Sequence, residues 1–233
     1  MKKLAFVLLV GALISGVAVA DSLSVQAGAA MGGTNFGLEV LHDNTSIAYV
    51  QDDSPNAERT YRAEFLFAVP SLTKSPGVGF RQTIFTAIGS NPRPGVGLCS
   101  PTAAFIEAIR CFHWNRSPTG VELQCFSRGD FCGERNSGDL IDINTQDTNT
   151  NGSVRVCIEW VGGVGTDGGS ISLGVVDDDE ACTAAAMNGN NLTNNDVDVQ
   201  FVRLGTPQGN FFSASENVTY YFDEFASFRT LAP

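Results

Sequence analysis

The sequence has few of the residues that a zinc site or a nucleic-acid interface requires. It contains only 2 histidines, and none of its 6 cysteines belongs to a CxxC pair, which argues against a zinc site. The 14 lysine and arginine residues are outnumbered by 25 aspartate and glutamate residues, so the formal net charge is −11. Such a charge repels nucleic acid and anionic membranes, and no basic stripe is present to contact phosphates. We therefore expect no nucleic-acid partner.

The N-terminal residues form a pattern typical of a secretory signal peptide. Lys2 and Lys3 precede an apolar stretch over residues 4–20, which ends with small residues at the two positions that a signal peptidase requires. The stretch is at the short limit for a membrane span, and no second apolar run follows. We predict that residues 1–20 are cleaved near Ala20, with no membrane insertion afterwards and a secreted, periplasmic or cell-surface location. A membrane anchor is the alternative.

All six cysteines follow this N-terminal segment. An even number of cysteines in an exported chain indicates disulfides. The spacing favours a bridge between Cys125 and Cys132, whose short loop would contribute roughly 2.5 kcal/mol to stability. The pairing of the other four stays open; they are Cys99, Cys111, Cys157 and Cys182.

After the N-terminal segment, helical periodicity is almost absent. Short alternating runs, separated by clusters of Gly, Asn, Asp, Ser and Pro, are typical of an all-β sandwich. The alternation predicts three sets of side chains that each share one face: Tyr61, Ala63, Phe65 and Phe67; Val154, Val156, Ile158 and Trp160; and Ile106, Ala108, Phe112 and Trp114. About ten such runs occur, and we predict one antiparallel, disulfide-stabilised β-sandwich domain over residues 21–233.

Several of these runs together resemble bacterial laminin-G-like domains, which have a concanavalin A-like jelly-roll fold. The first part of the resemblance is "GLEV" followed by "AYVQDDSPNAERTYRAEFLF". The later part comprises Trp160 before a Gly-rich turn, Arg203-Leu204-Gly205, and Phe222-Asp223-Glu224-Phe225 in the last strand. The resemblance covers nearly all of residues 21–233 and departs from the family in the cysteine-rich middle. It implies the fold rather than the function, because such sandwiches include lectins, adhesins, hydrolases and structural modules.

Hydrolases of the wider concanavalin-like class carry clustered carboxylates on one strand, and this sequence lacks them. No strand contains Glu-x-Asp-x-x-Glu, which would place an acid and a nucleophile about 5–5.5 Å apart. Asp223 and Glu224 are adjacent and are expected on opposite faces of a strand. His42 and His113 lie near no Gly-x-Ser-x-Gly elbow and are predicted to be polar surface residues. We therefore predict no catalytic residues and no enzyme, with a glycoside hydrolase-like enzyme without a recognisable carboxylate motif as the alternative.

Two segments are candidate calcium sites, and calcium is the one cofactor that the sequence suggests. "DTNTNG" begins like a calcium-binding loop, with side-chain oxygens at alternate positions, although the closing glutamate is one position late. "DDDE" brings together adjacent carboxylates that a cation would stabilise. The alternatives are an ordinary Asn-rich turn and a solvated loop. The candidate ligands are Asp147, Asn149 and Asn151 in the first segment, and Asp177, Asp178 and Asp179 in the second.

Two further features suggest a binding function. Arg128, Gly129 and Asp130 form an Arg-Gly-Asp tripeptide, which would serve as an adhesion loop or as an ordinary turn in which glycine takes a positive φ. Trp114 would serve as a platform on which a sugar ring stacks, unless it is buried. We therefore predict a secreted, non-catalytic module that binds a glycan or an extracellular protein. A structural envelope component or adhesin that presents the tripeptide is the alternative.

Overall fold

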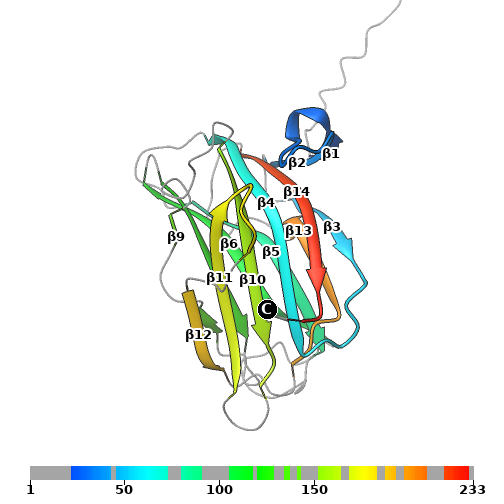
Figure 1. Cartoon of the computed structure of the whole chain (residues 1–233), viewed down its shortest axis with the longest axis vertical. Helices are drawn as coiled ribbons and strands as arrows, with labels where there is room; N and C mark the ends of the chain where they lie inside the picture. Colours follow the sequence, from blue (N-terminus) through cyan, green and yellow to red (C-terminus); the bar gives the residue numbers. More distant parts are fainter. Residues whose placement is uncertain are drawn as a thin grey trace, which may run out of the picture.

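The protein is a sandwich of two antiparallel sheets (Figure 1). A computed structural model describes residues 22–42, 46–72, 80–90, 105–117, 120–128, 134–136, 141–142, 152–163, 168–182, 187–192, 197–208 and 218–230. Apart from a short 3-10 turn, η1 (Ala27–Ala29), every regular element in these residues is a β-strand. The predicted all-β, antiparallel sandwich is therefore confirmed. No helix in the described part of the chain is long and apolar enough to cross a membrane, and the predicted signal peptide lies outside that part.

Sheet A contains seven strands in the order β1-β2-β14-β4-β10-β11-β12. They are β1 (Ser22–Gln26), β2 (Gly37–His42), β14 (Val218–Phe228), β4 (Thr60–Leu72), β10 (Ser153–Val161), β11 (Gly169–Asp177) and β12 (Met187–Leu192). Sheet B has the order β3-β13-β5-β6-β7-β8, and β9 also pairs with β7. Its strands are β3 (Ala48–Asp52), β13 (Phe201–Thr206), β5 (Phe80–Ser90), β6 (Phe105–Ser117), β7 (Gly120–Arg128), β8 (Glu134–Asn136) and β9 (Ile141–Asp142).

The hydrophobic core lies between the two sheets. The side chains predicted to face inward from β4 and β10 are all in it, because the register between these two strands runs without a bulge. Those residues are Tyr61, Ala63, Phe65 and Phe67 in β4 and Val154, Val156, Ile158 and Trp160 in β10. The indole N–H of Trp160 donates a hydrogen bond of 2.8 Å to the hydroxyl of Ser127 in the facing sheet. The largest core side chain therefore buries no unpaired donor.

Strand β6 departs from the predicted alternation. Its register with β5 shifts between Thr83 and Phe85 and again between Ala87 and Ile88. A bulge inserts one residue on one strand, so that the side chains after it change face. Ile106, Ala108 and Ile109 belong to the core, whereas Phe112 and Trp114 face away from it. The prediction that these two aromatic residues share a face with Ile106 and Ala108 is wrong.

Two disulfides occur among the described residues, and they correct the predicted pairing. Cys111 on β6 and Cys125 on β7 are directly opposite in register, with a Cα–Cα distance of 4.1 Å, and they are bonded to each other. Cys125 is therefore not bonded to Cys132, because strand pairing rather than nearness in sequence selects its partner. The second bridge joins Cys157 to Cys182. Such bridges indicate folding in an oxidising compartment. Cys99 and Cys132 lie outside the described residues.

Candidate functional site

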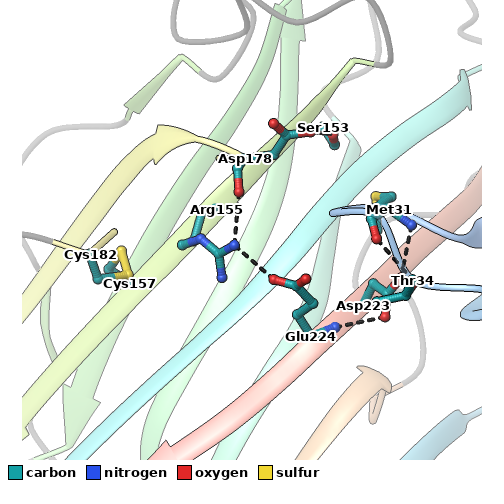
Figure 2. Close-up of polar contacts among 9 residues, drawn as sticks. All are labelled: Met31, Thr34, Ser153, Arg155, Cys157, Asp178, Cys182, Asp223 and Glu224. Carbon is teal, nitrogen blue, oxygen red and sulfur yellow. Dashed lines mark hydrogen bonds and ion pairs between the residues drawn. A yellow bond between two sulfur atoms is a disulfide. The ribbon is translucent and has the colours of Figure 1, made fainter. Parts of the chain in front are cut away.

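Asp223 and Glu224 lie on the same outer face of sheet A (Figure 2). The register of β14 with β4 shifts after Asp223, and Glu224 has a φ of 48°, in the left-handed region. This bulge turns the second side chain back toward the face of the first. The prediction that the two carboxylates point to opposite faces is therefore wrong, since strict alternation holds only where a strand has no bulge.

Asp223 fastens the turn at residues 31–34 onto sheet A, and Glu224 binds the neighbouring Arg155. The Oδ2 atom of Asp223 accepts hydrogen bonds from the Met31 N–H, at 2.8 Å, and from the Thr34 hydroxyl. Glu224 forms an ion pair of 2.8 Å with Arg155 (Figure 2). Gly32 has a φ of 59°, which favours glycine, and a Cβ atom there would lie 2.5 Å from the Oε1 atom of Glu224, so a larger residue would displace that side chain. The two carboxylates are therefore occupied by structural contacts.

We expect that Asp223→Ala lowers the free energy of unfolding by about 1–3 kcal/mol, since the buried Met31 N–H and the Thr34 hydroxyl lose their acceptor. Urea unfolding of the purified protein measures the change. The matched control is Asp179→Ala, at an exposed aspartate in the turn after β11, which should change stability by less than about 0.5 kcal/mol. Equal losses in the two variants would show that the turn is not held by Asp223.

The acidic segment after β11 is tied to β10 by hydrogen bonds. The Ser153 hydroxyl donates to the carboxylate of Asp178 at 2.5 Å, and the guanidinium of Arg155 donates to its carbonyl at 2.8 Å. In the part of the chain that the structure describes, no group of three or more His, Cys, Asp or Glu could hold a metal ion. A calcium ion at Asp177, Asp178 and Asp179 therefore stays a prediction. The other candidate ligands, Asp147, Asn149 and Asn151, lie outside the described residues.

Both histidines are buried, and the prediction that they are surface residues is wrong. His42 is 1% exposed and His113 is 0% exposed. The bulge in β6 turns His113 toward sheet A, where its Nδ1 atom lies 2.9 Å from the hydroxyl of Tyr220. Burial disfavours the charged form of each group, so it lowers the pKa of His113 to about 3 and raises the pKa of Tyr220. The pair is part of the packed interior.

The outer face of sheet B carries aromatic and arginine side chains. An antiparallel sheet that faces solvent usually presents polar side chains there. Here the guanidinium of Arg81 lies 3.5 Å from the ring centre of Phe112, 5.2 Å from that of Phe126 and 5.4 Å from that of Trp114. Such contacts are favourable cation–π interactions. Trp114, which the sequence suggested as a sugar platform, is half-buried on this face.

Next to these rings, four residues form a straight line across neighbouring strands, which we call the arginine row. Gln51 on β3 is opposite Arg203 on β13, Arg203 is opposite Thr86 on β5, and Thr86 is opposite Arg110 on β6. Directly opposed residues point to the same side of a sheet, so all four lie on the outer face. Neighbouring strands are about 4.8 Å apart, which places the Cα atoms of the two arginines about 10 Å from each other.

Each arginine of the row is fixed by contacts with neighbouring side chains. The Nε atom of Arg203 donates to Gln51 at 2.9 Å, and its guanidinium lies 4.5 Å from the ring centre of Tyr49 and 5.2 Å from that of Phe201. Arg110 lies 4.9 Å from the ring centre of Phe112 and 3.4 Å from a carboxylate oxygen of Glu107. The row therefore presents two positioned cations among aromatic rings.

A glycine in β13 allows the neighbouring strand to come close enough for these contacts. Gly205 has a φ of 128°, and a Cβ atom there would lie 2.5 Å from the carbonyl oxygen of Ala48 and 2.9 Å from the Cα atom of Tyr49. Any larger residue would push β3 away from β13. The glycine of the "RLG" run therefore helps to place Tyr49 beside Arg203.

The structure describes only the backbone of the first residue of the Arg-Gly-Asp tripeptide. Arg128 is the last residue of β7, where its backbone pairs with Glu134. Gly129 and Asp130 lie outside the described residues. The adhesion loop that the sequence suggested therefore stays a prediction.

No protein-family model and no curated protein matches this sequence. Among solved structures, the chain is similar to an alginate lyase from Klebsiella pneumoniae, with 13% identity, coverage of 84% of this chain and 74% of that chain, and a TM-score of 0.42. It is also similar to the binding domain of botulinum neurotoxin DC in complex with SialylT, with 10% identity over 91% and 48% of the two chains and a TM-score of 0.45. A third similar structure is lectin II from Ulex europaeus, with 13% identity over 88% and 92% and a TM-score of 0.38.

These comparisons correct one prediction. Because an alginate lyase is among the similar structures, the prediction that this chain is not an enzyme is contradicted and is not kept. The assignment of the fold rests on the strand order of the chain itself, which is that of a sandwich of two antiparallel sheets.

Proposed function

We propose that this protein is an exported module that binds a glycan on the outer face of sheet B. The observation that carries the proposal is the concentration of aromatic rings and positioned arginines on that face. The two disulfides support export, as does the signal-like pattern of residues 1–20. The proposal includes cleavage near Ala20 and one laminin-G-like domain over residues 21–233.

The face has the chemistry that sugar binding requires. An aromatic ring offers an apolar surface to the C–H groups of a sugar, while nearby polar groups form hydrogen bonds with its hydroxyls. Trp114 lies near one end of β6 and Phe105 at the other, where Phe105 is 49% exposed and packs edge-on against Phe201 at 5.8 Å. Nine residues of strand span about 30 Å. The arginine row lies between these ends, so the face suits a chain of several sugar units.

We expect that Trp114→Ala weakens glycan binding about tenfold, because it removes a stacking surface and leaves the core untouched. A glycan array of the purified protein first identifies a ligand, and calorimetry then measures its affinity for each variant. The matched control is Phe228→Ala. Phe228 is also a partly exposed ring beneath an arginine, with Arg62 4.9 Å from its centre, but it lies on sheet A.

The control should bind the glycan as the unchanged protein does. If no glycan on the array binds, or if the two variants lose affinity equally, the proposal is wrong. Far-UV circular dichroism of both variants shows whether each one folds.

A further inference from the structure

We infer that the glycan bound at this face is anionic, and that the arginine row binds one of its carboxylate or sulfate groups between Arg203 and Arg110. This inference rests on the proposed function and names the chemical class of its ligand. Four observations carry it: the contacts of Arg203, the contacts of the other arginines, the state of Thr86, and the contacts of Arg110.

The first observation is that the guanidinium of Arg203 is held in place by its neighbours but uses only one of its nitrogen atoms to donate a hydrogen bond to a described residue. Its Nε atom donates to Gln51, and its guanidinium lies over the rings of Tyr49 and Phe201. Its two terminal nitrogen atoms form no hydrogen bond with any residue that the structure describes. A planar guanidinium with two parallel N–H groups matches the two oxygens of a carboxylate or sulfate. Arg203 thus offers two parallel N–H donors in a fixed orientation.

The contacts of Arg203 also differ from those of other arginines in the fold. Arg62, Arg155 and Arg229 each form an ion pair with a carboxylate at 2.7, 2.8 and 3.0 Å. The described polar partner of Arg203 is the neutral amide of Gln51, which in turn donates to Asp53 at 2.7 Å. Within the described part of the chain, no carboxylate neutralises the positive charge of Arg203 by direct contact. An anion is the ligand that would complete this site.

The third observation concerns Thr86, which lies between the two arginines. It is 1% exposed, and its hydroxyl has no hydrogen-bond partner among the residues that the structure describes. Buried hydroxyl groups are nearly always hydrogen-bonded, so an unpaired one marks a place where a partner is missing. An oxygen atom of a ligand held between Arg203 and Arg110 would supply the missing acceptor.

The fourth observation concerns Arg110, whose side chain is only 13% exposed. Its ion pair with Glu107 is 3.4 Å long, which is longer than those of Arg62 and Arg155. Gln208 also donates a hydrogen bond to Glu107, and its Oε1 atom accepts one of 3.4 Å from Arg110. Because the chain carries a net charge of −11, long-range attraction does not favour a polyanion. Binding must come from these local contacts.

The test compares the binding of three polysaccharides to the full exported protein by calorimetry. The probes are polygalacturonate, which carries carboxylates, dextran sulfate, which carries sulfates, and unmodified dextran, which is neutral. We expect one of the two anionic polymers to bind at least tenfold more tightly than dextran. Arg203→Gln should remove that advantage, and Arg203→Lys should restore only part of it, since a lysine keeps the charge but not the two parallel donors.

Two further variants separate a specific site from general attraction. Thr86→Val keeps the shape of the side chain and removes the hydroxyl, and it should weaken binding of the anionic polymer several-fold. Arg62→Gln removes an arginine of the same charge that stacks on Phe228 of sheet A, and it should leave binding unchanged.

The outcomes distinguish this inference from the proposed function. Binding of only the carboxylated or only the sulfated polymer supports the inference and identifies the group. If the neutral and anionic polymers bind equally and Arg203→Gln has no effect, the inference is wrong while glycan binding stands. Equal losses in Arg203→Gln and Arg62→Gln also overturn it, because the attraction would then be general. If no glycan of any class binds, the proposed function fails as well.

Discussion

Replacing Cys157 and Cys182 together by alanine is expected to lower the free energy of unfolding by about 3.5 kcal/mol. The bridge closes a loop with a sequence separation of 25 residues and fastens the segment after β11 to β10 (Figure 2). Without the bridge, the unfolded chain regains the conformational entropy that the closed loop removes, and this stabilises the unfolded state. Domains of this kind are typically stable by about 5–15 kcal/mol, so the loss is a large part of the total.

The corresponding change at Cys111 and Cys125 is expected to lower the free energy of unfolding by about 3 kcal/mol, because the loop, with a sequence separation of 14 residues, is shorter. Urea unfolding of both double variants measures the two losses. Peptide mapping of the unreduced protein by mass spectrometry checks the pairing independently. A peptide that joins Cys125 to Cys132 would contradict the register of β6 with β7.

Acidification is expected to destabilise the protein through His113. Its pKa is about 3 in the folded protein, because burial disfavours the imidazolium, and about 6.5 in the unfolded chain. Between these values the unfolded chain binds more protons, so the free energy of unfolding falls by about 1.4 kcal/mol for each pH unit. The loss begins below pH 6.5 and amounts to about 2.5 kcal/mol at pH 4.5. Urea unfolding at a series of pH values measures it.

The control for this effect is His113→Gln. Glutamine keeps a polar group near the hydroxyl of Tyr220 but does not titrate. Carboxylates titrate in both proteins, so the difference between the two pH profiles isolates the histidine. The variant should lose most of the slope between pH 6.5 and 4.5, and identical slopes would contradict the buried, neutral state of His113.

The sequence predicted the inward faces correctly wherever the strands pair without bulges. In β4 and β10 the apolar residues alternate strictly, and the register of the pair is continuous. Residues such as Phe65 and Ile158 therefore point inward as the pattern requires. The alternation of apolar and polar residues in a sequence therefore predicts which side chains face inward as long as the strand contains no bulge.

The errors of the sequence analysis occur at bulges. One bulge region in β6 separates Phe112 and Trp114 from the core side, and another in β14 brings Glu224 onto the face of Asp223. A bulge is set by how two strands fit in three dimensions, and no local sequence signal marks these two. The buried His113 follows from the same bulge in β6. The pairing of Cys125 was misjudged for a related reason, since strand register decides it.

The candidate site was predicted only in part. Trp114 stood out because of its residue type and its polar neighbours. Arg203, Thr86 and Arg110 did not, because they come from three strands that are far apart in the sequence and adjacent only in sheet B. The outward position of Arg203 in "VDVQFVRL" was the one available signal. A line of residues across a sheet becomes visible only when strand order and register are known.

The most direct test of the central claim uses the two tryptophans of the chain, Trp114 and Trp160. Trp114 lies on the outer face of sheet B, whereas Trp160 is buried between the sheets and bonded to Ser127. Each indole N–H gives its own nitrogen–proton NMR signal, so Trp160 is an internal control during a titration with the glycan that the array selects. We predict that the signal of Trp114 shifts in proportion to saturation while that of Trp160 stays in place. Saturation of binding with no shift at Trp114 would contradict the assignment of the outer face of sheet B as the binding site.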